Sequence, residues 1–324
     1  AWTLAVPLIH AWATTWAMTE RVIAGPMVAS AVLFAVPACL LASASPFTIR
    51  LVSRITADHE IGLSAGVVGM FATLGSFVGT FLTGFVLIPQ FGVRTIFVMT
   101  GLIEAGLGIA VLLACRCRAS VQAAAVVGIV AIAAANMLGK PMETEGLIHK
   151  QQTFYHDLRV EEWSTDLGER VRGLKLDTTL EGGQYVETGG VFMATNLYWR
   201  LAEEFCPRLD RTLFLGGGGF GMPEDYSRRH PEGTADVVEL DPAVIDVGRR
   251  FFRLDEFPRV HPIACDARRY LAASTTTYDM IFCDAYHGVR NIPAHLVTRE
   301  FFVLVKSRLV DDGVFLANVI SPVT

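Results

Sequence analysis

Residues 1–139 carry only ten of the 59 Asp, Glu, Lys and Arg side chains of this chain, and residues 140–324 carry the other 49. A globular domain in water has about a quarter of its residues charged, which matches the second region but not the first. The first region lacks the charge to cover a water-exposed surface, so we expect it to lie in a lipid bilayer. The second region is long enough to form a folded domain with its own core.

The first region divides into stretches that are long and apolar enough to be transmembrane helices. Crossing the hydrocarbon core of a bilayer takes about 20 apolar residues in a helix. The apolar stretches are residues 2–18, 22–45, 62–89, 95–115 and 121–139. We expect four spans, with the first stretch as a fifth candidate, and hence a multi-pass membrane protein. The chain begins without Met inside an apolar run, which we interpret as a cropped or processed start rather than a signal peptide, because further spans follow.

Two features of these stretches have alternative interpretations. Glu104 lies near the middle of its stretch, where an ionisable side chain is costly. It is therefore either functional, for instance in a transport path, or hydrogen-bonded to a neighbouring helix. Gly75 and Gly79 form a GxxxG pattern that lets helices pack closely, either within the chain or at a dimer face. We expect a homodimer.

The second region alternates predicted strands and helices. Short apolar and polar groups broken by glycines predict a small β-region of hairpins over residues 152–195. Residues 196–205 and 298–309 have helical spacing. Apolar runs predict five strands, at residues 211–215, 235–240, 260–265, 278–283 and 313–319. Such alternation implies a parallel sheet with helices on both faces.

We therefore predict an α-helical transmembrane region over residues 1–139, followed by a linker and the small β-region over residues 140–208. Residues 209–324 are predicted to form a Rossmann-like, methyltransferase-type α/β domain that binds a nucleoside. The chain ends just after the fifth predicted strand, and a fold of this kind usually adds more sheet, so we expect the C-terminus to be cropped as well.

A cluster of glycines follows the first predicted strand, within the run from Leu213 to Gly221. A strand, a tight glycine turn and a helix bring backbone close to a ligand and point free helix N–H groups at it. Eighteen residues beyond Gly221 the second strand ends in Glu239, the spacing at which doubly wound folds place a carboxylate on ribose hydroxyls. Asp266 and Asp284 follow the third and fourth strands. Because ligands bind beyond the carboxyl ends of parallel strands, these residues predict one shared site.

Each of the three acidic residues also has a structural interpretation. Glu239 could simply precede the next helix, where acids are favourable. Asp266 could cap the helix that runs through Tyr270, and Asp284 could serve a turn. We expect binding for Glu239 and a site role for Asp284, while capping and binding are equally expected and compatible for Asp266.

At these residues the chain resembles the spermidine synthase family of polyamine aminopropyltransferases, in its membrane-fused branch, over roughly residues 150–320. The family has a glycine turn, an acidic ribose ligand, an Asp-Ala pair at adenine and an active loop that carries the catalytic aspartate. The resemblance implies that the donor nucleoside is bound by Gly216, Gly217, Gly218, Gly219, Gly221, Glu239, Asp266, Ala267 and Gln184. It also implies that Asp284 is the catalytic base and that Tyr198 and His287 lie on the substrate side.

The chain departs from the family in the acidic half of the site, which grips a cationic amine. The family's aspartate in the glycine turn is Gly219 here, and the second aspartate of its active loop is His287. The acidic pair before its tyrosine is Thr195-Asn196. Two acidic residues on the helix after the turn are candidates to compensate, Glu224 and Asp225.

The resemblance implies an aminopropyltransferase that uses decarboxylated S-adenosylmethionine and an amine as substrates. One alternative is a methyltransferase that uses S-adenosylmethionine, because the chain lacks the turn aspartate that would favour the decarboxylated donor. Another is a non-catalytic membrane sensor of polyamine or adenosyl metabolites. We expect no nucleic-acid partner, and no metal because none of the six cysteines forms a CxxC pair. Basic residues are balanced on the two sides of the spans, so their distribution does not indicate the orientation in the membrane. We place the second region in the cytoplasm, at the cell membrane, because the inferred ligand is an intracellular metabolite.

Overall fold

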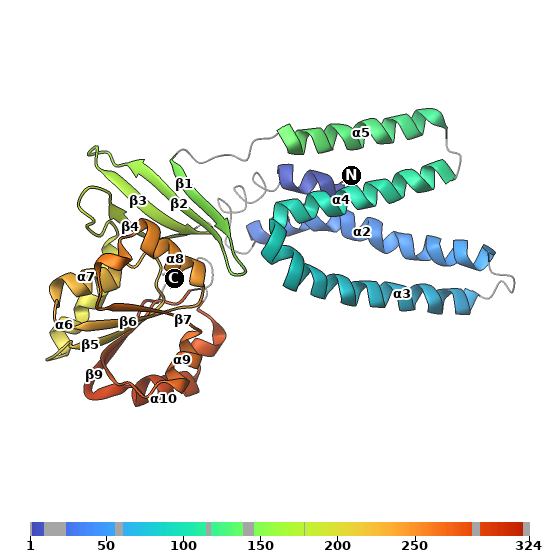
Figure 1. The fold of residues 1–324 in the computed structure, drawn as a ribbon. Helices are drawn as coiled ribbons and strands as arrows, with labels where there is room; N and C mark the ends of the chain where they lie inside the picture. Colours follow the sequence, from blue (N-terminus) through green and yellow to red (C-terminus); the bar gives the residue numbers. More distant parts are fainter. Residues whose placement is uncertain are drawn as a thin grey trace. The chain divides into compact units, whose positions relative to one another are not determined.

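The computed structural model describes residues 2–9, 24–55, 61–114, 118–138, 146–177, 179–286 and 292–319. The chain divides into two compact units, residues 1–142 and residues 143–324 (Figure 1).

The first unit is helical. Residues 2–9 form a short helix. The other elements are α2 (Ala24–Ile55), α3 (Ile61–Leu82), the π-helical turn η1 (Thr83–Leu87), α4 (Ile88–Ala114) and α5 (Ala119–Leu138). Gly92 has φ 72° and ψ 153°, which breaks the helix between the third and fourth predicted stretches. Within the described residues, four helical segments are long and apolar enough to cross a membrane, namely Met27–Arg54, Ile61–Leu87, Gln90–Leu113 and Ala119–Asn136.

The structure bears on both open questions about these helices. The hydroxyl of Thr3 donates a hydrogen bond to Oε2 of Glu104 over 2.6 Å, so Glu104 is bonded to a neighbouring helix, as one of the two interpretations expected. A Cβ placed on Gly75 or Gly79 would meet no described atom within 4 Å. Within the described residues, the GxxxG stripe therefore packs against no other helix of the chain.

The second unit begins with an antiparallel sheet in the order β1-β2-β3-β4, which confirms the small β-region. Its strands are β1 (Leu147–Gln152), β2 (Asp157–Ser164), β3 (Arg170–Leu176) and β4 (Thr179–Tyr185). Leu158, Val160 and Leu174 are fully buried and join the core beneath the sheet. The alternation of inward and outward side chains is what one buried face requires.

The predicted Rossmann-like domain is present. Its five strands are all parallel, in the order β7-β6-β5-β8-β9. They are β5 (Arg211–Leu215), β6 (Thr234–Glu239), β7 (Val260–Ala264), β8 (Tyr278–Cys283) and β9 (Leu309–Ala317). The helices are α6 (Ala202–Phe205), α7 (Gly221–Arg229), α8 (Pro242–Phe251), α9 (Ala267–Ala273) and α10 (Arg299–Ser307), with 3₁₀ turns η2 (Ala194–Leu201), η3 (Leu254–Glu256) and η4 (Ala294–Leu296).

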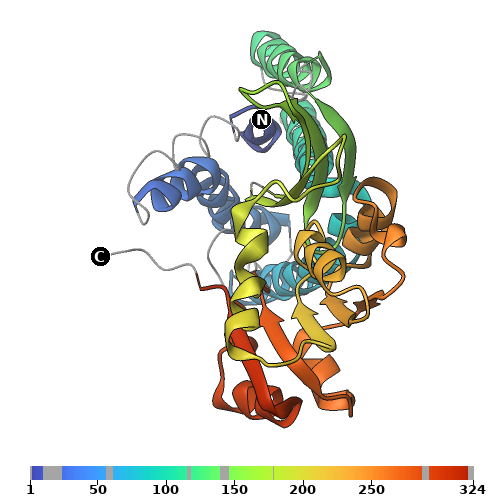
Figure 2. The same cartoon turned by 90° about the vertical axis from the view of Figure 1, so that its left-hand side faces the viewer.

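Two predicted elements differ in detail. The last strand begins at Leu309, before the predicted start at residue 313, because an irregular register accommodates the extra residues opposite β8. The predicted helix over residues 196–205 is mostly the 3₁₀ turn η2, and only Ala202–Phe205 is α-helical. Figure 2 shows this yellow segment beside the five-stranded sheet, where α6 contacts β9.

Two cores lie on the two faces of the parallel sheet. Phe214 and Val237 point to the face covered by α7 and α8, whereas Leu213 and Val238 point to the face covered by α9 and α10 (Figure 1). Neighbouring residues of a strand point to opposite faces, so each strand contributes to both cores. A sheet buried on both faces explains why its strands read as continuous apolar runs.

Candidate functional site

One pocket lies at the carboxyl ends of β5, β6 and β8 and is closed on its other side by the small β-region. This is where a parallel α/β sheet binds its ligands. From the parallel sheet and its helices it is lined by Gly216, Gly217, Gly218, Met222, Pro223, Val238, Glu239, Leu240, Cys265, Asp266, Ala267, Asp284, Ala285, Tyr286, Pro293, His295 and Leu296. The β-region and η2 add His156, Leu176, Glu181 and Asn196.

The glycine turn after β5 is held between two other segments of backbone. Gly216 has φ 107°, and a Cβ there would overlap the carbonyl group of Asp284. Gly218 has φ 45°, and a Cβ there would lie 2.9 Å from the carbonyl oxygen of Glu181. Positive φ and the lack of a side chain both select glycine at these positions. The turn thus reaches β4 on one side and the loop after β8 on the other.

Glu239 fixes the turn to the end of β6. Its Oε2 accepts a hydrogen bond from the N–H of Gly217 and its Oε1 accepts one from the N–H of Asp241, each over 2.9 Å. Burial raises the pKa of Glu239, and the two N–H donors partly offset this by stabilising the carboxylate. Each carboxylate oxygen keeps a lone pair that can accept from a ligand hydroxyl.

Asp266 is the N-cap of α9, as one of its two interpretations expected. Its Oδ1 accepts from the N–H of Arg269, and its Oδ2 lies 2.9 Å from Nε2 of His295 on η4. Asp266 and Ala267 both line the pocket, so the cap also faces the candidate site. Capping therefore does not remove the residue from the pocket.

Asp284 follows β8 and faces the same pocket as Glu239. Burial raises the pKa of Asp284, and the Asn318 amide, which donates to Oδ1 over 3.1 Å, acts in the opposite direction. A carboxylate held at an elevated pKa is a stronger base than an exposed one. The four predicted strand-end positions thus meet at one pocket.

Three predicted binding residues do not line this pocket. Gln184 is buried, and its amide donates to the carboxylate of Glu224 and, over 3.0 Å, to the carbonyl of Phe252. Gly219 and Gly221 are not among the lining residues, and they lie against Gly182 and Asn196 respectively. The prediction that Gln184 contacts the nucleoside was therefore wrong, because its side chain forms hydrogen bonds within the core instead of lining the pocket.

The substrate-side residues are also placed differently. Tyr198 lies on η2 with an exposed ring and does not line the pocket. The proposed compensation by Glu224 and Asp225 fails, because the Glu224 side chain is fully buried and Asp225 accepts two hydrogen bonds from Arg200. His287 lies outside the described residues.

The β-region and η2 contribute three polar lining residues that the sequence analysis did not predict as binding residues: His156, Glu181 and Asn196. The best signal for Glu181 was the pair Gly182-Gly183 directly after it, because glycines inside a strand often mark a close backbone approach. Asn196 is buried, and among the described residues its Oδ1 has no hydrogen-bond partner. In the part of the chain that the structure describes, no three His, Cys, Asp or Glu side chains cluster as a metal site would need.

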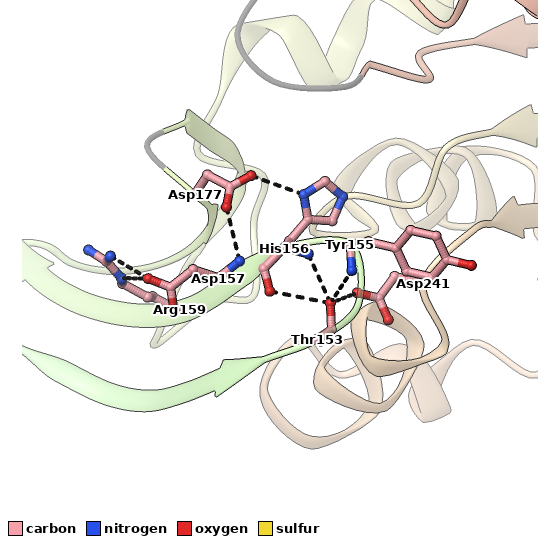
Figure 3. A network of polar contacts seen from close by, with 7 residues as sticks. All are labelled: Thr153, Tyr155, His156, Asp157, Arg159, Asp177 and Asp241. Carbon is pink, nitrogen blue, oxygen red and sulfur yellow. Dashed lines mark hydrogen bonds and ion pairs between the residues drawn. The ribbon is translucent and has the colours of Figure 1, made fainter. Parts of the chain in front are cut away.

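His156 lies in the turn between β1 and β2, and Figure 3 shows the polar contacts around it. Its Nδ1 lies 3.2 Å from Oδ2 of Asp177 at the end of β3. The Thr153 hydroxyl accepts from the N–H of His156 and donates to Oδ2 of Asp241, the N-cap of α8, over 2.5 Å. This network ties the β-region to the residue that also holds Glu239.

Comparison with known proteins agrees with this geometry. The family model for the spermine/spermidine synthase domain matches residues 197–323. A polyamine aminopropyltransferase of Vibrio vulnificus is 31% identical over 186 residues, covering 54% of this chain and 60% of that protein. Polyamine aminopropyltransferase 1 of Streptomyces coelicolor is 26% identical over 325 residues, covering 91% of this chain and 59% of that protein.

A solved structure of a probable spermidine synthase from Corynebacterium glutamicum is similar with a TM-score of 0.45 and 20% identity, covering 55% of this chain and 64% of its own. The chain spans less than two thirds of the length of each of these relatives. The matched domain and the curated relatives therefore confirm the expected resemblance to the spermidine synthase family, which the family model places at residues 197–323.

Proposed function

We propose that the chain is a membrane-anchored aminopropyltransferase, which moves the aminopropyl group of decarboxylated S-adenosylmethionine to an amine. The observation that supports this most is the meeting of the glycine turn, Glu239, Asp266 and Asp284 around one pocket, in a chain that resembles the spermidine synthase family. A nucleoside donor needs hydrogen-bond acceptors at its ribose and adenine, and the pocket offers a carboxylate for each.

In this proposal the nucleoside lies along the strand ends. Glu239 accepts hydrogen bonds from the ribose hydroxyls, using the lone pairs left by Gly217 and Asp241. Asp266 accepts from the amino group of adenine, and the adjacent Ala267 leaves room for the ring. The glycine backbone lies along the chain that is attached to sulfur, where side chains would obstruct it.

The proposed reaction is an in-line displacement. The amine nitrogen attacks the carbon next to the sulfonium, the new C–N bond forms as the C–S bond breaks, and the electron pair of that bond stays on sulfur. Methylthioadenosine then leaves as a neutral thioether. Asp284 takes one proton from the attacking nitrogen, a role that its raised pKa favours and that is typically worth about 10²–10⁴-fold in rate. Alignment of the two reactants supplies several kcal/mol more, of order 10 kcal/mol at most. The displacement itself needs no metal.

We also propose that the first unit anchors the enzyme in the cell membrane, with the second unit in the cytoplasm. Support for the anchor comes from the four long apolar helical segments of the described residues. We propose a homodimer, with the GxxxG stripe of α3 as its face, since Gly75 and Gly79 pack against none of the described helices. Cross-linking in lipid vesicles tests the dimer, and protease access in sealed vesicles tests the orientation.

The activity is tested by mass spectrometry of the full chain in detergent micelles, incubated with either decarboxylated S-adenosylmethionine or S-adenosylmethionine and a panel of amines. We expect methylthioadenosine and an amine that is heavier by one aminopropyl group. A methylated product would instead identify a methyltransferase. Nucleoside binding without any product would identify a sensor.

A further inference from the structure

The wall of the pocket that faces the strand ends is formed by β4 and η2, and it carries an acidic residue. Glu181 lies on β4 directly before Gly182-Gly183 and lines the pocket. Gly182 packs against Gly219 so closely that a Cβ on Gly182 would lie 2.9 Å from the Gly219 Cα. This contact holds β4 against the glycine turn, and it places Glu181 next to Gly218.

Glu181 differs from the other acidic residues of the pocket in the hydrogen bonds of its carboxylate. Glu239 and Asp266 each accept hydrogen bonds from backbone N–H groups, and Asp284 accepts from Asn318. The acids on the neighbouring helix α7 are held elsewhere, as described above. Among the described residues, Glu181 is therefore the pocket carboxylate whose side chain accepts no hydrogen bond from a backbone N–H or a side-chain amide.

The charges around Glu181 favour a cation beside it. Its pKa is raised to about 7, first by burial, then by the negative charge of Asp284, and further by Glu239 and Asp177. His156, on the turn between β1 and β2, acts in the opposite direction. A bound ammonium group would offset the repulsion between these carboxylates and would favour the ionised form of Glu181.

A second polar group of the same wall points to the same ligand. Asn196 on η2 lines the pocket and is 6% exposed, and its Oδ1 finds no partner among the described residues. A Cβ on Gly221 would lie 3.0 Å from this oxygen, which places Asn196 against the end of the glycine turn. An unpaired buried acceptor is costly unless a donor from a ligand satisfies it.

We propose that Glu181 and Asn196 hold the reacting nitrogen of the acceptor, an aliphatic primary amine that enters as its ammonium ion. This proposal rests on the proposed function. The carboxylate of Glu181 and Oδ1 of Asn196 accept hydrogen bonds from the ammonium group and aim its nitrogen at the carbon next to sulfur. Asp284 removes one proton, the neutral nitrogen then forms the C–N bond, and the C–S bond pair remains on sulfur. Glu181 thus supplies a negative charge to the amine half of the site, where the sequence lacks the family's acids.

The test uses the full chain in micelles, with decarboxylated S-adenosylmethionine as donor and 1,4-diaminobutane as acceptor, between pH 6 and pH 9. The variants are Glu181→Gln and the shorter acid Glu181→Asp. Glu232→Gln is the matched control, because the Glu232 side chain is 92% exposed and forms a surface ion pair with Arg259. Rates of methylthioadenosine release give kcat and KM, and calorimetry with methylthioadenosine gives nucleoside affinity.

We expect Glu181→Gln to raise the KM for the amine at least about tenfold, because it removes a charge-assisted hydrogen bond. The kcat and the nucleoside affinity should stay within about threefold of the parent, and Glu181→Asp should keep part of the amine affinity. In the parent, KM should fall as pH rises through about 7 and Glu181 ionises, whereas in Glu181→Gln this dependence should be lost.

An unchanged KM for the amine in Glu181→Gln, or a loss of nucleoside affinity that accounts for the whole loss of rate, would overturn the assignment while the proposed function stands. Absence of transfer by the parent chain with every amine would instead overturn the proposed function, and the assignment with it. If Glu181→Gln unfolds, the KM of Glu181→Asp decides, and a value equal to the parent's counts against the assignment.

Discussion

Gly182 and Gly219 touch backbone to backbone, and a Cβ on either residue would come within 3.0 Å of the Cα of the other. The resemblance to the family aligns its turn aspartate with Gly219, and in this chain β4 occupies the space that a side chain there would need. The acidic half of the pocket is thereby supplied from β4, through Glu181, rather than from the turn.

This contact predicts that restoring the family's aspartate does not restore the family's site. Gly219→Asp and Gly219→Ala should both lower the free energy of unfolding by about 1–3 kcal/mol, since each inserts a Cβ against Gly182. Denaturant unfolding of the full chain measures this. A loss confined to the Asp variant would show that its charge, rather than the space, is at fault.

A second prediction concerns the proposed base. Asp284→Asn should lower kcat by about 10²-fold or more, because the amide cannot take the proton, while the affinity for methylthioadenosine stays within about threefold. Asp255→Asn is the matched control, since the Asp255 side chain is 74% exposed on the surface. Full turnover by Asp284→Asn would remove Asp284 from the proposed mechanism.

A third prediction follows from the buried carboxyl of Glu224. Burial raises its pKa from 4.5 to about 9, so between these values the folded chain keeps a proton that the unfolded chain releases. This proton stabilises the fold fully below pH 4.5, and its contribution is lost as the pH rises towards about 9. The free energy of unfolding should therefore fall by up to about 1.4 kcal/mol per pH unit in this range.

Glu224→Gln removes this titration while keeping a side chain of similar shape next to Gln184. We expect its thermal midpoint to fall less than that of the parent between pH 6 and pH 8.5. Glu232→Gln, which alters an exposed carboxylate, should keep the parent's dependence. Parallel curves for the parent and Glu224→Gln would show that Glu224 ionises without cost in the fold.

A fourth prediction concerns the network of Figure 3. Thr153→Val removes the hydroxyl that joins the β1–β2 turn to Asp241, the residue whose N–H holds Glu239. We expect a loss of about 1 kcal/mol in the free energy of unfolding and a several-fold weaker affinity for methylthioadenosine, measured by calorimetry. Thr165→Val, in the turn between β2 and β3 and outside the pocket lining, should leave that affinity unchanged.

The strand ends were predictable from the sequence because local patterns determine them. Glu239 and Asp284 each follow an apolar run, and the parallel sheet places such ends at one edge. Asp266 was predictable as a cap for the same local reason, since a side-chain acceptor at a helix start satisfies a free N–H group.

The other wall of the pocket was not predictable, because tertiary contacts decide it. The choice of Glu181 over Gln184 depends on where β4 meets the glycine turn, which is set by the contact between two glycines distant in sequence. The spacing around Tyr198 suggested an α-helix, but η2 is a 3₁₀ turn with about three residues per turn. Asn196 and Trp199 are therefore the buried pair, and Tyr198 faces outwards.

The matched family domain begins at residue 197, after the whole of β4. A fragment cut at that boundary would retain the ends of the parallel strands but would lose Glu181, Asn196 and His156, and with them the opposite wall of the pocket. Any truncated form intended for ligand screening should therefore start ahead of β1, since a shorter one presents inhibitors with only half of the surface that they must fit.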